Sequence, residues 1–362
     1  MKFFHLSDLH IGIKLYNREL LEDQKIVLRQ IVEQAGKECP DAIVIAGDIF
    51  DKAIPSVEAV SVFDQFVRAL RKEVPDTVIM MISGNHDSAP RVNLYRNILE
   101  EQKIYMVGMP PQRPEEQIEK VTLQDAWGNV NFYLLPFIKP SMVKQVVGTE
   151  ENGNLLSYQE SLRRMIEREQ IREEERNVCV SHQFYLPVGT GAEQVQRMDS
   201  EICTVGNIDQ VSAEILKQFD YSALGHIHRP VKVGEDRIRY CGTPMQYSVS
   251  EAGQKKAILM VELKEKGTYS VTPIPLNAPH EVRIIKGKLN EILKLECEDY
   301  VSVLLTDRMD LDICDMQDRL YTAFPNLLEI RRERWDRPDY EMADSQVEMD
   351  MDPYLLCCSF LR

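Results

Sequence analysis

The stretch Ala42-Ile43-Val44-Ile45-Ala46-Gly47-Asp48 places a short apolar run directly before a glycine and an aspartate. The run Val78–Ile82 has the same arrangement, because Gly84-Asn85-His86-Asp87 follows it closely. Both runs have the length and the β-branched or apolar content of buried strands, and amphipathic helical patterns at about 18–37 and 57–72 precede them. Strands that alternate with helices indicate βαβ units. The sequence therefore predicts an α/β fold around a buried sheet.

Later segments extend this sheet and divide the chain. Strand-like runs recur at 130–135, 178–180, 221–224 and 257–263, and 155–176 has the pattern of a charged, solvated helix. Pro273, Pro275 and Pro279 then indicate a boundary. We predict a first domain over 1–275, a small α+β domain over 280–337, and over 338–362 an acidic linker with the start of an apolar attachment segment.

Composition excludes several classes of protein. The chain has 362 residues, of which 44% are hydrophobic and 28% are charged, as in ordinary globular domains. No apolar run reaches the roughly 18–20 residues of a membrane span, and eight scattered cysteines without a Cys-x-x-Cys pair are typical of a reducing compartment. We therefore expect a cytoplasmic protein without a membrane anchor. The net charge of −15 argues against nonspecific binding of nucleic acid over the whole surface, but it leaves a local groove or a metal site open.

Polar side chains follow five of the predicted strands. The segments are Asp8-Leu9-His10, Gly47–Asp51, Gly84–Asp87, Ser181-His182 and Gly225–His228. Because loops at the carboxyl ends of parallel strands meet at one edge of a sheet, these side chains are expected to converge. Their carboxylates, imidazoles and amide suit Mn²⁺, Fe or Zn²⁺, and two such ions about 3.5–4 Å apart with a shared carboxylate would promote hydrolysis of a phosphoester. A single Asp-x-His is common surface decoration, but five such segments in series are not.

These motifs, in this order, resemble the calcineurin-like metallophosphoesterase superfamily, and within it the nuclease subunits of bacterial SbcCD complexes. The segments Ser181–Phe184, Asp220–Arg229 and Tyr240–Pro244 add to the resemblance, which spans about residues 1–250. It implies a four-layer αββα core, and the small domain that follows is similar in placement to the family's DNA-capping domain.

The resemblance also implies the roles of individual residues. Asp8, His10, Asp48 and His228 would hold one Mn²⁺, and Asp48, Asn85, His182 and His226 would hold the other, with Mg²⁺ or another divalent ion as a substitute. His86 would be the general acid or transition-state stabiliser, and Asp87 would orient it. Asp51 stands where archaeal relatives have a histidine, which is a departure from the family pattern. His5 is expected to be structural.

The implied activity is Mn²⁺-dependent hydrolysis of DNA, as a 3′-to-5′ exonuclease on duplex ends and an endonuclease on single strands and hairpins, in DNA repair, recombination and replication. The implied partner is SbcC, an SMC-like ATPase, and the chain itself has no Gly-x-x-x-x-Gly-Lys-[Ser/Thr] motif for ATP. Relatives attach to SbcC through C-terminal helices, which the apolar pattern after Tyr354 would begin. A homodimer is expected through helices at 57–72 and 92–101.

Two other interpretations remain open from the residues. A small-molecule or cyclic-nucleotide phosphodiesterase, or a protein phosphatase, would use the same ligands, although Lys52-Ala53 and Asp87 differ from the phosphatase pattern of Arg-Gly and Glu. A noncatalytic scaffold that holds an ATPase on DNA would have no reason to keep seven ligand positions together with His86.

Overall fold

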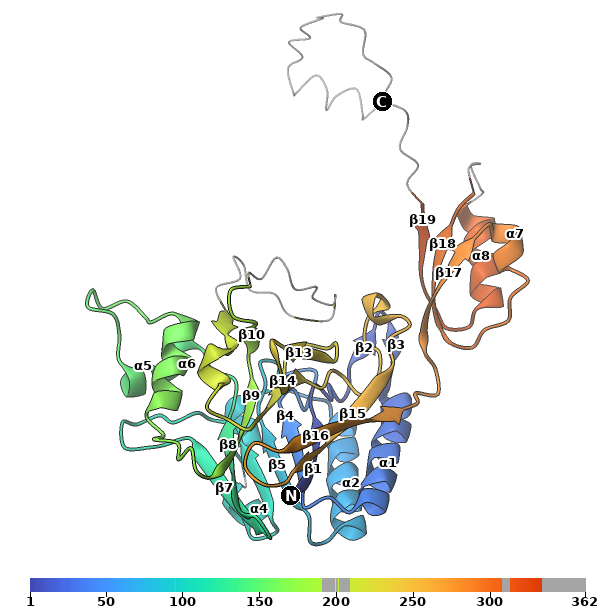
Figure 1. Cartoon of the computed structure of the whole chain (residues 1–362). Coiled ribbons are helices and arrows are strands. Elements are labelled where there is room, and N and C mark those ends of the chain that lie inside the picture. Colours follow the sequence, from blue (N-terminus) through green and yellow to red (C-terminus); the bar gives the residue numbers. More distant parts are fainter. Residues whose placement is uncertain (95, 191–198, 200, 202–208, 308–312, 334–362) are drawn as a thin grey trace, which may run out of the picture.

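The computed structural model describes residues 1–94, 96–190, 199, 201, 209–307 and 313–333. Two six-stranded sheets pack face to face, and helices cover their outer faces (Figure 1). The predicted four-layer αββα arrangement is confirmed. The predicted segment at 338–362 lies outside the described residues. None of the described helices is long and apolar enough to cross a bilayer.

The first sheet has the strand order β16-β15-β1-β4-β5-β6. Its strands are β1 (Lys2–Leu6), β4 (Ala42–Ala46), β5 (Val78–Ile82), β6 (Ile104–Val107), β15 (Lys256–Leu263) and β16 (Tyr269–Leu276). The strands β1, β4, β5 and β6 run parallel, whereas β15 pairs antiparallel with β1. Helices α1 (Leu21–Glu38) and α2 (Val57–Glu73) pack on the outer face through apolar stripes, and Ser56 caps α2 by accepting a hydrogen bond from Ala59 N–H.

The second sheet has the order β13-β14-β12-β9-β8-β7. Its strands are β7 (Glu119–Asp125), β8 (Gly128–Leu135), β9 (Arg176–His182), β12 (Tyr221–Gly225), β13 (Val231–Val233) and β14 (Glu235–Tyr240), and its outer face is covered by α5 (Pro140–Val147) and α6 (Tyr158–Glu167). The inner faces of both sheets form one apolar layer, in which the rings of Phe3 and Phe132 meet edge to face at 5.3 Å. Burial of this apolar layer holds the two sheets together, so the strand ends of one sheet keep a fixed position relative to those of the other.

Shorter elements complete the first part of the chain. They are β2 (Lys14–Leu15), β3 (Arg18–Glu19), α3 (Ala89–Val92), α4 (Arg96–Glu100), β10 (Phe184–Leu186), β11 (Gln210–Ser212), η3 (Ala213–Leu216) and η4 (Val249–Glu251). Three helix predictions were too long. The helix predicted from 18 begins at Leu21, because Arg18 pairs with Leu15 in a short hairpin. Within the helix predicted at 92–101, α3 already ends at Val92, and α4 covers Arg96–Glu100.

The third overlong prediction is the charged helix at 155–176. Helix α6 ends at Glu167, and β9 already begins at Arg176. Gln170 adopts a left-handed backbone with φ of 47°, which a continuous helix does not permit. The side chain of Glu169 accepts a hydrogen bond from Ile118 N–H. This charged residue therefore contacts a neighbouring loop and does not lie on the solvated face of a helix.

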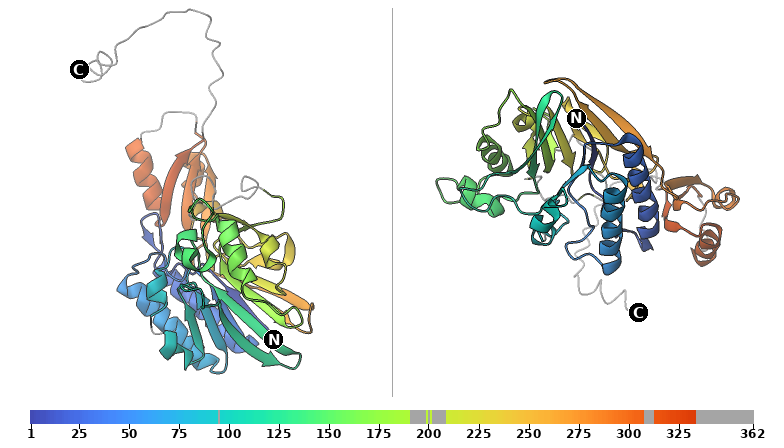
Figure 2. Two further views of the ribbon diagram at one scale, coloured as in Figure 1. Left: turned by 90° about the vertical axis from the view of Figure 1, so that its left-hand side faces the viewer. Right: turned by 90° about the horizontal axis from the view of Figure 1, so that it is seen from below.

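Residues 282–333, which we call the small unit, form a second layered structure. Its parallel strands are β17 (Val282–Gly287), β18 (Tyr300–Leu305) and β19 (Leu327–Arg332), with helices α7 (Leu289–Ile292) and α8 (Ile313–Ala323) on one face. It has its own core around Val301, Leu320 and Phe324. Figure 2 shows the small unit on the α1 side of the first sheet, away from α5 and α6.

Candidate metal centre

The polar segments singled out from the sequence meet at one edge of the two sheets. Asp8 follows β1, Asp48 follows β4 and Asn85 follows β5, all from the first sheet, while His182 ends β9 and His226 follows β12 in the second. The second sheet's parallel pair brings Gly225 opposite His182. The centre is therefore assembled from both sheets, at the carboxyl ends of their strands.

Backbone hydrogen bonds tie the first two loops together. The amides of Asp8 and His10 donate to the carbonyls of Gly47 and Asp48, each at 3.0 Å. Four predicted ligands have left-handed backbones, with φ of 51° at Asp8, 42° at His10, 49° at Asp48 and 102° at His226. Such conformations cost roughly 1–3 kcal/mol each and persist where the surrounding structure holds them, as at functional sites.

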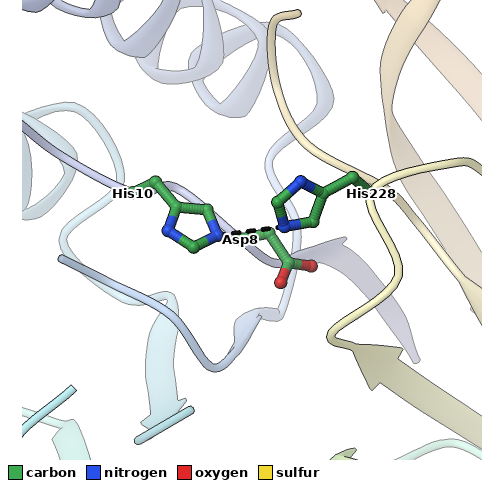
Figure 3. Close-up of side chains that lie close together, drawn as sticks. All are labelled: Asp8, His10 and His228. Carbon is green, nitrogen blue, oxygen red and sulfur yellow. Dashed lines mark hydrogen bonds between the residues drawn. The ribbon is translucent and has the colours of Figure 1, made fainter. Parts of the chain in front are cut away.

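One group of donors consists of Asp8, His10 and His228 (Figure 3). The Nε2 atoms of His10 and His228 face each other at 3.1 Å. The carboxylate of Asp8 lies beside them and accepts a hydrogen bond from His226 N–H at 3.0 Å. All three donor residues are buried, so their polar atoms need partners within the protein or a bound ion.

A second group lies around Asp48. Its Oδ2 atom is 3.2 Å from His182 Nε2 and 3.6 Å from His10 Nε2, so this carboxylate stands between donors of both groups. The amide oxygen of Asn85 lies 3.0 Å from His182 Nε2 and 2.8 Å from His226 Nδ1. The structure thus brings together all seven residues to which the family resemblance gives a metal-binding role.

Burial and mutual charge set the ionisation of the centre. Burial would raise the pKa of Asp48, but His182 and His10 outweigh it and hold that pKa well below its usual range. Burial likewise acts to lower the pKa of His182, yet Asp48 raises it to about 9. His10 differs, because burial dominates and keeps its pKa well below the ordinary value. The centre is therefore a cluster of carboxylates and imidazoles whose pKa values are shifted by burial and by one another.

Residues 1–230 match the family model of the calcineurin-like phosphoesterases. The chain belongs to the calcineurin-like phosphoesterase family. Residues 278–361 match a second family model, SbcD_C, described as the type 5 capsule protein repressor C-terminal domain. The first match makes this calcineurin-like phosphoesterase a metal-dependent hydrolase of phosphoesters. The second is the C-terminal domain of an SbcD-like family.

Two solved structures are also similar to this phosphoesterase. A dimetal phosphatase from Danio rerio has 15% sequence identity and a TM-score of 0.40, with 77% of this chain and 99% of that chain covered. The GAP50 anchor of the inner membrane complex of Plasmodium has 11% identity and a TM-score of 0.40, with 93% of this chain and 98% of that chain covered.

The donor set of this calcineurin-like phosphoesterase fits two divalent metal ions. It offers carboxylate oxygens, imidazole nitrogens and an amide oxygen, without a thiolate, and three overlapping groups of donors each lie within 4.8 Å. Such donors suit Mn²⁺, Fe or Zn²⁺.

His86 and Asp87 occupy different surroundings in this loop. The His86 amide donates to Asp48 Oδ1 at 2.8 Å, and its Nδ1 lies 2.8 Å from the carbonyl oxygen of Asp51. The carboxylate of Asp87 accepts hydrogen bonds from the amides of Ile49, Phe50 and Gly84 at 2.9–3.0 Å. Asp87 therefore joins two loops of the centre, and the acceptor next to the His86 ring is Asp51.

Several buried residues behind the ligands had no signal in the sequence analysis. Glu251 Oε1 lies 3.9 Å from His228 Nδ1, and its other oxygen accepts a hydrogen bond from Lys256 Nζ at 2.6 Å. Glu201 accepts a hydrogen bond from the His228 amide at 2.9 Å. The expected structural role of His5 agrees with its contacts to Tyr221 Oη and Leu224 O.

Proposed function

We propose that the chain is a Mn²⁺-dependent DNA nuclease that works in the cytoplasm with the ATPase SbcC in DNA repair, recombination and replication. Its activities would be 3′-to-5′ exonuclease on duplex ends and endonuclease on single strands and hairpins. The observation that carries the proposal is the combination, in one chain, of a dimetal phosphoesterase centre with a C-terminal match to the SbcD_C family.

The proposed ligand division is the one that the family resemblance implies, and the observed distances support it. Asp8, His10 and His228 would hold one ion, and Asn85, His182 and His226 the other, with Asp48 between them. Two divalent ions would polarise the phosphoryl oxygen and supply hydroxide near neutral pH. The chain's own contribution would be a buried set of donors at the strand ends, which would hold the phosphodiester in place against the two ions.

His86 is proposed to protonate or stabilise the departing sugar oxygen. Donation from Nδ1 to the Asp51 carbonyl would fix the ring and leave Nε2 for the substrate. The bond from the His86 amide to Asp48 Oδ1 keeps the ring next to the carboxylate that both ions would share. Asp87 would act through the loop geometry, by holding the Gly84–Asp87 turn against residues 49 and 50.

The chain is also proposed to form a homodimer through α2 and α4. An apolar groove of about 480 Å³ lies between these helices, with Phe50, Phe63 and Leu99 in its lining. Leu94 in this lining is 56% exposed, and Val57 in the first turn of α2 and Ile98 in α4 are 81% and 65% exposed. Large apolar side chains that gather on one face favour an interface, and a second copy presents the complementary surface.

The nuclease proposal is tested by incubating an end-labelled DNA hairpin and a linear duplex with the purified chain, with Mn²⁺, with Mg²⁺ and with chelator. Mn²⁺-dependent cuts that disappear in His86→Ser, while DNA and Mn²⁺ binding persist, support the nuclease and the role of His86. Cleavage that survives in His86→Ser contradicts that role. Turnover of a cyclic nucleotide or an aryl phosphodiester without any cutting of DNA, also in the presence of SbcC, would favour the small-molecule esterase.

The dimer is tested by sedimentation of Val57→Glu and Leu94→Glu. Both positions are exposed, and an acid in the first turn of α2 is favourable for the helix, so the monomer should fold. We expect both variants to be monomers at concentrations where the wild type is a dimer. Leu155→Glu, an exposed position that does not line the groove, is the matched control and should leave the dimer intact.

A further inference from the structure

Two pairs of adjacent buried residues link the small unit to the loop that carries His10. The first pair is Asp23-Gln24 in α1, and the second is Gln246-Tyr247, just before η4. All four residues are less than 8% exposed. In each pair one side chain contacts the small unit or the segment that leads into it, and its neighbour contacts the His10 loop.

Asp23 and Gln246 hold the start of the small unit. The Asp23 carboxylate accepts a hydrogen bond from Tyr300 Oη at 3.2 Å and contacts His280 Nδ1 at 2.9 Å. The Gln246 side-chain oxygen accepts a hydrogen bond from Val282 N–H at 2.5 Å. These polar contacts hold the first residues of β17 and β18 against the phosphoesterase domain.

Gln24 and Tyr247 hold the loop between Leu9 and Gly12. Gln24 Oε1 accepts a hydrogen bond from Gly12 N–H at 2.9 Å, and its Nε2 lies 2.9 Å from the His10 carbonyl oxygen. Tyr247 Oη donates to the Leu9 carbonyl at 2.6 Å. The amide of Gln24 also lies 3.1 Å from Tyr247 Oη, so the two pairs contact each other.

The Tyr247 ring adds a direct contact with the ligands. It meets the His10 ring edge to face at 5.8 Å and the His228 ring at 6.5 Å. His10 has a left-handed backbone, which the surrounding contacts must hold. Because consecutive residues of a helix move together, a displacement of Asp23 would also displace Gln24.

We propose that Gln24 and Tyr247 are positioning residues for the His10 loop, and that Asp23 and Gln246 couple their position to the small unit. The inference rests on the proposed function in so far as His10 and His228 bind a metal ion. A macromolecule that moves the small unit would then change the affinity of the centre for metal. By reciprocity, metal binding would change the attachment of the small unit.

The first test uses Tyr300→Phe, which removes one hydroxyl from Asp23 and touches no metal ligand. Hydrogen exchange of the metal-free protein is measured on the peptide that contains Gly12. We expect exchange of this peptide to become about fivefold faster and Mn²⁺ affinity, measured by calorimetry, to fall by about fivefold. His280→Ala removes the other contact of Asp23 from a partly exposed position and should act in the same direction.

The matched control is Gln30→Ala. Gln30 is also a glutamine of α1, and its side chain bonds to Asn277 in the segment that leads to the small unit, but it has no bond to the His10 loop. This variant should leave exchange at Gly12 and Mn²⁺ affinity unchanged. Tyr247→Phe, which removes the bond to Leu9, is the positive control and should accelerate exchange at Gly12.

The coupling between the small unit and the His10 loop is overturned if Tyr247→Phe accelerates exchange at Gly12 but Tyr300→Phe and His280→Ala both leave it unchanged. Unchanged exchange in Tyr247→Phe overturns the positioning role. Because exchange is measured without metal or DNA, these results do not depend on the nuclease activity. A wild-type protein that binds Mn²⁺ but cuts no DNA would contradict the proposed substrate only.

Discussion

The Nε2 atoms of His10 and His228 lie 3.1 Å apart in a buried centre, although the two residues are 218 positions apart in the chain. At this distance two imidazole nitrogens must share a proton or both bind one cation. The neighbouring carboxylates of Asp8 and Asp48 favour a cation. The pair therefore brings the loop after β1 against the loop after β12, and a cation bound by both imidazoles would join the two loops.

The first prediction concerns this pair. In His228→Gln, Mn²⁺ should bind with an affinity at least about tenfold lower at one of two sites, because an amide replaces a buried imidazole donor. At a Mn²⁺ concentration of 100 times Kd, bound ion stabilises the wild type by about 2.7 kcal/mol, and this stabilisation should shrink in the variant. Calorimetric titration and thermal unfolding with and without chelator measure both effects. Equal titrations of variant and wild type would remove His228 from the ligand set.

A second prediction follows from Gly84. A Cβ atom added there would lie 2.2 Å from Asp48 Oδ1 and 2.4 Å from the Asp48 backbone nitrogen, so the shared carboxylate would have to move. Gly84→Ala should therefore lose Mn²⁺ binding at both sites. Gly287→Ala is the matched control, because its added Cβ would meet Ile292 only at 3.4 Å, and it should bind Mn²⁺ as the wild type does. Normal titration of Gly84→Ala would show that Asp48 can be displaced without loss.

A third prediction separates two roles of Glu251. Glu251→Gln should lower Mn²⁺ affinity by about tenfold, as loss of the partner behind a metal-binding histidine does. It should also destabilise the fold by about 3–5 kcal/mol, because Lys256 is buried and loses its charged partner.

The double variant Glu251→Gln with Lys256→Met is the decisive control for this prediction. It removes the unpaired charge, so urea denaturation should find much of the stability restored. Mn²⁺ affinity should remain low, because His228 still lacks the carboxylate behind it. Recovery of affinity together with stability would mean that Glu251 only neutralises Lys256.

The sequence predicted the strand ends and their polar loops because both signals are local. The apolar runs before Asp48 and Asn85 have the length of single strands, and parallel pairing brings their ends together whatever the loops contain. Helix lengths were predicted less well. The left-handed backbone of Gln170 interrupts one helical pattern, and the pairing of Arg18 with Leu15 replaces the start of another. Periodicity alone would continue both patterns.

The contacts behind the metal ligands could not be predicted from local patterns. Gln24 lies on a helix that periodicity identifies only as amphipathic, and Tyr247 lies 223 positions later, yet the two side chains meet at 3.1 Å. Such pairs depend on how the segment between β14 and β15 packs against α1. The same holds for Asp23 and Tyr300, which join segments that the sequence assigns to different domains.

The last prediction concerns acid stability at the opposite end of the strands. Asp125 closes β7 and accepts hydrogen bonds from the guanidinium of Arg176, with Nη1 at 3.0 Å and Nη2 at 2.5 Å. Burial would raise the pKa of Asp125, but Arg176 and the N-terminal ammonium of Met1 outweigh it and hold that pKa well below the usual range. A carboxyl whose pKa is lower in the folded state contributes its full stability above the unfolded pKa of about 4 and loses it as the pH falls below that value.

Asp125→Asn should therefore lower the free energy of unfolding by about 1–3 kcal/mol at pH 7, because Arg176 keeps its bonds to the carbonyls of Gly128 and Lys264 but loses its charged partner. The difference from the wild type should narrow as the pH is lowered below 4. Urea denaturation at a series of pH values measures it. Asp76→Asn, which removes a fully exposed partner of Lys103, is the control and should change stability by no more than about 0.5 kcal/mol. A difference that stays constant down to pH 3 would contradict the lowered pKa of Asp125, because protonation of this carboxyl in the unfolded chain would then not reduce the advantage of the wild type.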